Sequence, residues 1–176
     1  MEEMTAKFPN NELLKQRGVF IQSLLAKKPP IDLNEVPADQ KTVPLADLVF
    51  AEANIGWGSV CRNFVPEDVF IQVAGEFYDA GLFAHAPSLY VIPCDAKWKR
   101  FLFEYGMQDG HPGTVVFVVS GDGMELFRSD IVRQGDKPDR KELDITGVRR
   151  LELSVDETED GRSSDWAVWL APKLER

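Results

Sequence analysis

Six side chains have the types and positions needed to bind a small polar ligand: Trp57, His85, Arg133, Asp136, Asp165 and Trp166. They fall in or beside predicted loops, where binding residues are commonly presented. An arginine can donate hydrogen bonds to two adjacent hydroxyls, an aspartate can accept two, and an indole ring can cover the apolar C–H face of a pyranose. These are the kinds of group that a small, preformed, concave site for a sugar needs.

Each of these residues also has a structural explanation. A tryptophan packs in a core or at its rim more often than it binds sugar, and Trp98 and Trp169, within strand patterns, are assigned to packing. His85 could be a buried histidine that holds two loops together. Arg133 and Asp136 could pair with each other across their loop, a solvated contact worth at most ~1 kcal/mol.

The chain carries few signals of catalysis. Its two histidines are His85 and His111, and His111 lies in a His-Pro-Gly turn. The sequence has no Gly-x-Ser-x-Gly elbow, phosphate-binding loop or His/Cys metal-ligand spacing. A glycosidase needs two carboxylates facing each other across a cleft, and the 29 acidic residues neither exclude nor single out such a pair. We therefore predict a protein that is not an enzyme.

The composition limits the partners and the compartment. A net charge of −9 argues against nucleic-acid binding, which needs a basic surface. No apolar run approaches the ~20 residues that span a bilayer. The first four residues lack the basic and apolar regions of a signal peptide, so the chain as given is either cytoplasmic or a mature or excised fragment. Cys61 and Cys94 are too few for a disulfide framework and are expected to be thiols.

Residues 1–44 differ in kind from the rest. Asn10 or Asn11 can cap a helix, and the following apolar residues recur at helical spacing at Leu14, Ile21, Leu24 and Leu25. Pro29 and Pro30 end this short predicted helix, and the prolines that follow predict an extended linker or strap over residues 29–44. An isolated helix of this length is marginal in water, so its apolar stripe must cover its own domain, a partner protein or a second copy of the chain.

From Leu45 the hydrophobic period becomes two. Strands are predicted over residues 48–51, 69–73, 89–92, 101–105, 115–119, 124–127, 141–145, 150–155 and 167–170. Leu151, Leu153 and Val155 should point inward, and Gly121-Asp122-Gly123 should form a hairpin turn. Many short strands joined by turns, without helices between them, predict an all-β domain over residues 45–176, folded as an antiparallel β-sandwich.

A spaced set of strings in this domain resembles a known family. The strings are Ile55-Gly56-Trp57-Gly58, Gly81-Leu82-Phe83-Ala84-His85-Ala86-Pro87-Ser88, Ser120-Gly121-Asp122-Gly123, Asp144-Ile145-Thr146-Gly147-Val148 and Asp165-Trp166-Ala167-Val168-Trp169. In this order they resemble the NPCBM family of carbohydrate-binding modules, first noted beside family-98 glycoside hydrolases. The resemblance runs from Leu45 to Arg176 and implies a jelly-roll sandwich that binds sugars of galactose type without catalysis.

The chain departs from the family pattern at two strings. Phe83 replaces the second glycine of Gly-x-Gly-x-His-Ala-Pro-Ser, whereas Trp166 and Val168 replace the histidine and the second acid of Asp-His-Ala-Asp-Trp. Either the site has changed its sugar, with Trp166 adding a stacking face, or sugar binding has been lost. In the second case the chain would be a structural or adaptor sandwich whose N-terminal helix docks a partner or a second copy.

The acidic stretch near the C-terminal end of the chain could suggest a calcium-binding loop. The stretch from Asp156 to Gly161 imitates the start of an EF-hand loop, but Ala167 stands where that loop needs a bidentate glutamate. The EF-hand interpretation therefore fails, and this charge run is expected to be a solvated turn. No cofactor is required, but the family resemblance leaves a structural calcium ion open, with ligands that the sequence does not identify.

Overall fold

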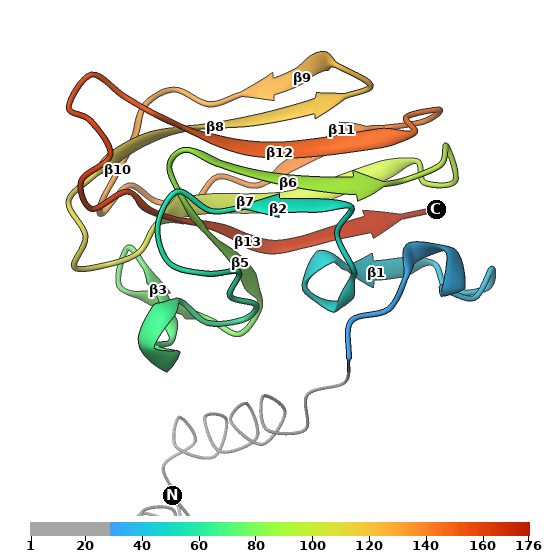
Figure 1. The fold of residues 1–176 in the computed structure, drawn as a ribbon, viewed down its shortest axis with the longest axis horizontal. Coiled ribbons are helices and arrows are strands. Elements are labelled where there is room, and N and C mark those ends of the chain that lie inside the picture. Colours follow the sequence, from blue (N-terminus) through green and yellow to red (C-terminus); the bar gives the residue numbers. More distant parts are fainter. Residues whose placement is uncertain (1–28) are drawn as a thin grey trace, which may run out of the picture.

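The computed structural model describes residues 29–176, whose regular structure is almost entirely antiparallel β-sheet (Figure 1). The first sheet contains β1 (Thr42–Pro44), β5 (Gly81–His85), β7 (Arg100–Met107), β11 (Lys141–Asp144) and β13 (Trp166–Glu175). The second contains β2 (Glu52–Asn54), β6 (Ser88–Pro93), β8 (Thr114–Gly121), β9 (Met124–Arg128), β10 (Val132–Arg133) and β12 (Arg150–Glu157). The predicted all-β class and antiparallel sandwich are confirmed.

Smaller elements complete the described part. A separate hairpin pairs β3 (Ile71–Val73) with β4 (Glu76–Tyr78), and three 3₁₀ turns span Leu33–Glu35, Leu45–Asp47 and Pro66–Asp68. No helix in this part of the chain is both long and apolar enough to cross a bilayer. The helix predicted before Pro29, and any partner or second copy that it would bind, lie outside the described residues.

Each sheet is built around one long central strand. In the first sheet β13 pairs with β7 along one edge. Along its other edge, β13 pairs first with β5 and then, nearer its C-terminal end, with β1. In the second sheet β8 pairs with β12 on one side and with β9 and β10 on the other, while β12 also pairs with β6. The main strand orders are therefore β5-β13-β7-β11 and β6-β12-β8-β9, and most successive strands alternate between the sheets.

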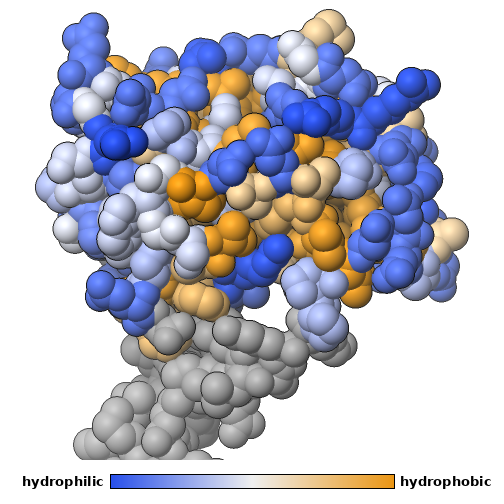
Figure 2. Space-filling model, viewed as in Figure 1, coloured by the Kyte–Doolittle hydropathy of each residue, from blue (hydrophilic) through white to orange (hydrophobic). Residues whose placement is uncertain are grey.

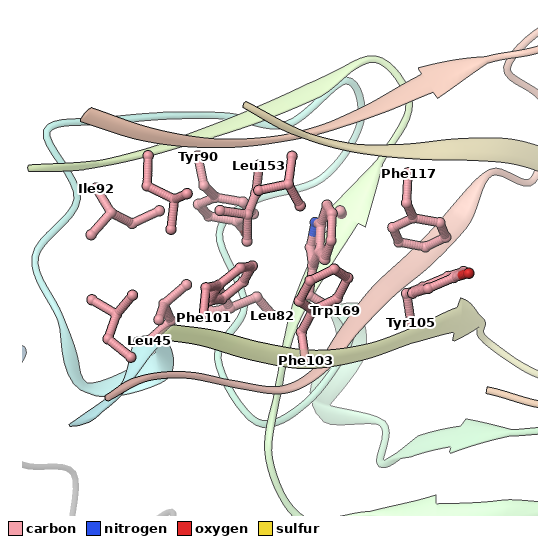
Figure 3. Close-up of a cluster of buried hydrophobic side chains, with 14 of the residues drawn as sticks. Leu45, Leu82, Tyr90, Ile92, Phe101, Phe103, Tyr105, Phe117, Leu153 and Trp169 are labelled. Atoms are coloured by element: carbon pink, nitrogen blue, oxygen red, sulfur yellow. The ribbon is translucent and has the colours of Figure 1, made fainter. Parts of the chain in front are cut away.

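Period-two alternation fills the space between the sheets. Leu151, Leu153 and Val155 are fully buried, as predicted, and each follows an outward residue on β12. The middle of the core is aromatic: Phe103 lies 5.4 Å from Trp169, which in turn lies 4.9 Å from Phe117, both in edge-to-face contact (Figure 3). Trp98 and Trp169 are buried, which confirms that both are packing residues, although Trp98 lies in the loop before β7.

The pair β5–β13 is buried on both faces, unlike the outer strands. On the inner side Leu82, Ala84, Ala167 and Trp169 belong to the sandwich core. On the outer side a second cluster joins Phe83, Val168 and Leu170 to Cys61, Val65, Ile71 and Val73 from the segment that contains β3. Because all five β5 residues are buried, the strand lacks alternation, and the sequence prediction missed it for that reason.

Two other features bear on the sequence predictions. The predicted strand over residues 48–51 is instead largely a connection, and the strand itself is β2, which starts at Glu52. The predicted hairpin after β8 is present, with Asp122 at φ 51° and Gly123 at φ 82°, the left-handed pair of a type I′ turn. The Asp122 carboxylate also accepts the Arg149 and Arg150 backbone N–H groups, and so connects this turn to the start of β12.

Residues 29–44 pack on the sandwich as well as leading into it. Leu33, Val36 and Val43 are buried in the main core, and Thr42–Pro44 adds to the edge of β13 as β1. Cys61 and Cys94 are both buried and are not joined in a disulfide, and burial raises the pKa of Cys94 to about 12. A thiol with so high a pKa stays protonated at neutral pH and is unreactive.

We predict that Phe117→Ala lowers the free energy of unfolding by about 3–5 kcal/mol, because it leaves a cavity between Tyr105 and Trp169. Val116→Ala, on the same strand but half-exposed, is the matched control and should cost about 1 kcal/mol or less. Urea unfolding followed by tryptophan fluorescence measures both. Equal losses for the two variants would contradict the assignment of the core.

Candidate functional site

Three of the six predicted site residues line one shallow pocket. Trp57, His85 and Trp166 meet there with Gly56, Arg162, Ser163 and Ser164. The register of the first sheet brings them together, because the last residue of β5, His85, pairs directly with the first residue of β13, Trp166. Trp57 comes from the loop after β2, and residues 162–164 come from the loop between β12 and β13.

Trp57 is the exposed aromatic ring of this pocket. The backbone N–H of Gly56 donates to the His85 carbonyl at 3.0 Å, which fixes the loop against the end of β5. A Cβ on Gly56 would lie 2.4 Å from the Ala86 carbonyl oxygen, so no other residue allows this approach. The neighbouring indole remains 49% exposed and is held at the pocket rim.

Trp166 supports Trp57 and has little free ring surface of its own. The His111 ring stacks on it at 3.8 Å between centroids and 10° between planes. Phe83 meets it edge to face at 5.2 Å, and the Trp57 ring lies 5.3 Å away. Because neighbouring rings surround the half-buried Trp166, it positions Trp57 better than it could stack on a ligand.

His85 is buried, with 6% of its surface exposed, and it contributes one free ring nitrogen to the site. Its Nδ1 lies 2.9 Å from the Ala86 carbonyl oxygen, which can only accept, so Nδ1 carries the proton. Burial lowers the pKa of His85 and outweighs the opposing effect of the Ala86 hydrogen bond, and the nearby Arg162 charge also lowers this pKa. The pKa of His111 is also lowered, mainly by burial. Both rings are therefore neutral at pH 7, and Nε2 of His85 is an acceptor.

Asp165 does not line the pocket, although its chain neighbours Ser164 and Trp166 do. The residue is fully buried, and neither carboxylate oxygen makes a hydrogen bond of ordinary geometry with the described residues. Burial raises the pKa of this carboxyl to about 6, although the Thr114 backbone N–H acts in the opposite direction. A Cβ on Gly113 would lie 2.3 Å from Asp165 Oδ1, so the carboxylate packs directly against the backbone before β8.

Arg133 and Asp136 lie elsewhere. Arg133 lines a second hollow with Thr114, Val116, Ile131, Glu157, Thr158, Glu159 and Asp160. The Asp136 carboxylate accepts the Arg133 backbone N–H at 2.8 Å and closes the turn after β10, and the two side chains form no ion pair. The β12–β13 loop separates the two hollows, with residues 157–160 on one side and residues 162–164 on the other.

A third hollow is largely apolar. It is lined by Pro30, Val49, Phe50, Ala53, Val60 and Arg62. The guanidinium of Arg62 already has partners within the protein. It lies over the Phe50 ring, 4.3 Å from the ring centroid, and donates a hydrogen bond to the Ala46 carbonyl. Apolar side chains also reach the surface near the middle of the face in Figure 2, between hydrophilic ones. An exposed apolar group alone therefore does not distinguish one hollow from another, whereas the Trp57 pocket places an exposed ring beside polar groups.

Sequence reasoning missed Arg162, Ser163, Ser164 and His111. The first three form the polar run between Gly161 and Asp165, directly before the strand that starts at Trp166. Their position next to two predicted site residues was the available signal. His111 was interpreted as a turn residue, and nothing in the sequence indicates that its ring stacks on Trp166, since the two are 55 positions apart.

The arrangement of the described residues provides no carboxylate or histidine cluster for a metal ion. No group of three or more His, Cys, Asp or Glu side chains is placed to hold one within residues 29–176. Asp160 accepts hydrogen bonds from the Thr114 and Thr158 hydroxyls, which is consistent with a closed turn. Backbone carbonyls can also bind calcium, so a structural calcium ion stays a prediction without assigned ligands.

Comparison with known proteins gives a consistent result. The family model described as NPCBM/NEW2 domain matches residues 41–175. A structure of CBM51-2 in complex with GlcNAc, with INT domains, from Clostridium perfringens ZmpB shares 25% identity and a TM-score of 0.72, covering 77% of this chain and 32% of that one. The CBM51 of Clostridium perfringens GH95 in complex with methyl-galactose shares 24% identity and a TM-score of 0.70, covering 76% and 99% of the two chains.

A curated relative belongs to a much longer protein. It is named as an endo-alpha-N-acetylgalactosaminidase of Renibacterium salmoninarum and is 24% identical over 127 residues. The match covers 68% of this chain but spans 8% of that protein. The fold is therefore that of a carbohydrate-binding module, and such modules occur as parts of larger proteins among the matches.

We predict that Asp165→Asn removes a pH-dependent loss of stability. The folded-state pKa of about 6 lies above the ordinary value of 3.8, so the folded state binds more protons between these values. Wild-type stability should therefore fall as the pH rises from about 4 to about 6 and stay lower above that, by up to about 3 kcal/mol. The variant cannot ionise and should lack this fall. Urea unfolding at pH 4 and pH 7.5 measures the difference.

The matched control is Asp144→Asn. Hydrogen bonds from Thr146 lower the pKa of Asp144, so its carboxylate stabilises the fold above its ordinary pKa. Removing that charge should make the variant lose stability relative to wild type as the pH rises, the opposite sign to Asp165→Asn. Parallel pH profiles for wild type and Asp165→Asn would show that the Asp165 carboxyl is not perturbed.

Proposed function

The chain belongs to the NPCBM/NEW2 domain family, and from this membership we propose that it is a non-catalytic carbohydrate-binding module whose sugar site is the Trp57 pocket. The single observation that carries the proposal is the placement of one half-exposed indole beside a neutral histidine and a polar loop. Sugar sites need an apolar face and fixed hydrogen-bonding groups at the same place, and this pocket has both. The second hollow has polar groups but no aromatic ring, and in the third hollow the Arg62 guanidinium already lies over the Phe50 ring.

Each side chain that lines the pocket would make a different contact with a sugar. Trp57 would cover the C–H face of one pyranose ring, while Nε2 of His85 accepts a hydrogen bond from a hydroxyl. Arg162 and the hydroxyls of Ser163 and Ser164 would donate to ring substituents on the other side. A volume of about 310 Å³ suits one sugar residue, so we expect recognition of a terminal unit or a single unit within a chain.

The lining of the pocket supports binding without hydrolysis. A glycosidase needs two carboxylates across a cleft, and no aspartate or glutamate lines the Trp57 pocket. The second hollow has carboxylates, but the Thr158 and Thr114 hydroxyls lower the pKa of Asp160. A general acid needs a raised pKa, so Asp160 is poorly suited to that role.

We further propose a galactose-type sugar and a jelly-roll form of the sandwich. The sugar class is supported by the related module that was solved with methyl-galactose, while another was solved with GlcNAc. The jelly-roll form is supported by the strand orders β5-β13-β7-β11 and β6-β12-β8-β9, in which the first and last main strands are neighbours. Arg133 and Asp136 are not included in the proposed site, because they contribute to the other hollow or its turn.

The proposal predicts that Trp57→Ala weakens sugar binding at least tenfold. The expected loss corresponds to a stacking contribution of about 1.5 kcal/mol, and the fold should survive because the ring is half-exposed. Isothermal titration with methyl galactosides, methyl glucosides and GlcNAc, preceded by a glycan array, measures it.

The control is Arg133→Ala, which changes the second hollow and should leave the affinity within twofold. The proposal is overturned if wild type binds no sugar at millimolar concentration. It is also overturned if Trp57→Ala binds as tightly as wild type while Arg133→Ala does not.

A further inference from the structure

The lining of the Trp57 pocket has an unbalanced charge. Arg162 is its one charged side chain, because the remaining lining residues are Gly56, Trp57, His85, Ser163, Ser164 and Trp166. Burial and the neighbouring guanidinium keep His85 neutral, and the carboxylate of Asp165 is buried outside the pocket lining. The pocket is therefore locally positive in a protein whose net charge is −9.

The guanidinium of Arg162 is also uncommitted. It makes no hydrogen bond, ion pair or ring contact with any residue in the described range 29–176. Some arginines of this acidic protein are neutralised, since Arg100 binds Glu142 and Glu175, and Arg128 binds Glu125 and Asp156. Within residues 29–176, Arg133, Arg140 and Arg149 also form no ion pair, but none of these three lines the Trp57 pocket. An exposed arginine at a pocket rim thus keeps all five N–H donors free for a ligand.

The loop that carries Arg162 keeps its acidic residues on the opposite side. Glu157, Glu159 and Asp160 line the second hollow, where Thr114 and Thr158 hold the Asp160 carboxylate. A backbone bridge from Thr158 to Gly161 closes the loop, and Gly161 has the left-handed φ of 79° that turns the chain. After this turn, residues 162–164 face the Trp57 pocket.

The hydrogen-bonding groups are consequently donors on one side and an acceptor on the other. Arg162 can only donate, and the hydroxyls of Ser163 and Ser164 can donate beside it. Nε2 of neutral His85 accepts. Neutral hydroxyls are commonly held by carboxylates, which this lining lacks, whereas a group that only accepts matches a guanidinium fork.

We propose that the preferred ligand of this pocket is an acidic sugar, whose carboxylate or sulfate group is bound by Arg162 while Trp57 covers the sugar ring. This inference rests on the proposed function of the same pocket and specifies its ligand class. A hydroxyl of the same sugar donates to His85 Nε2. The two acidic groups share the chemistry that Arg162 recognises, since each presents paired oxygen acceptors that bear negative charge.

The negative net charge of the protein does not oppose this assignment strongly. Charges beyond about 10 Å are largely screened at 0.1 M salt, whereas the guanidinium would touch the ligand directly. Glu157, Glu159 and Asp160 line the other hollow, and the Asp165 carboxylate, although ionised above its pKa of about 6, is fully buried outside the pocket lining and cannot touch a ligand there. Local charge therefore decides the preference at physiological salt.

Matched methyl glycosides test the proposal by isothermal titration at 0.1 M salt. Galactose, galacturonate and galactose 6-sulfate share one ring configuration and differ in charge at one position, and glucose with glucuronate forms a second set. We expect at least one acidic sugar to bind ten or more times tighter than its neutral partner. The carboxylate and sulfate arms show which acidic group is preferred.

Three variants assign that preference to Arg162. Arg162→Gln should remove the preference, because it should weaken binding of the acidic sugar at least tenfold more than it weakens binding of the neutral one. Arg162→Lys should keep part of it, because the charge stays and the fork is lost. Arg133→Gln, in the second hollow, should change nothing. Unchanged thermal unfolding of Arg162→Gln confirms that this exposed substitution leaves the fold intact.

The outcomes separate this inference from the function on which it rests. If neutral and acidic partners bind equally, or if Arg162→Gln keeps the preference, the acidic-sugar assignment is wrong and the carbohydrate-binding proposal stands. If wild type binds no sugar of either set at millimolar concentration and the glycan array is also blank, both are wrong.

Discussion

The antiparallel pairing of β5 with β13 is the constraint on which the rest of this structure depends. It places His85 opposite Trp166 at one end, while three residue pairs further on it places Leu82 opposite Trp169 in the sandwich core. The same ladder is covered on its outer face by the cluster under β3. Because it is buried on both faces, its register cannot slip by one residue without reversing every inward and outward side chain. His85 and Trp166, which line the pocket at the end of this ladder, are therefore held in a fixed register.

The site is built by close backbone approach at the end of this ladder. Gly56 lies against the carbonyls of His85 and Ala86, and that contact brings the next residue, Trp57, over the start of β13. The Trp166 ring, on which His111 stacks, then contacts the exposed indole of Trp57. Electrostatics follow from the same packing, since burial keeps both histidines neutral and raises the pKa of Asp165. Arg162 is left as the charged group of the pocket.

Local pattern was sufficient to predict most of the fold, for identifiable reasons. Alternation on β12 predicted that Leu151, Leu153 and Val155 point inward, and Asp122-Gly123 predicted a hairpin because few other residues adopt its left-handed backbone. The same reasoning missed β5, whose five buried residues do not alternate. It also placed Arg133 and Asp136 with Trp57, because polar loops look equivalent in a sequence although they lie at different hollows.

The sequence by itself determined the class of fold, the family and the chemical types available for a site, since these depend on periodicity, turn residues and composition. Tertiary structure decided which of those residues share a surface. It grouped Trp57, His85 and Trp166, added Arg162 from a loop about 105 positions beyond Trp57, and turned the acidic residues 157–160 away. The reason is that strand register and backbone approach act between distant segments, where no local pattern of residue types records which loops will meet.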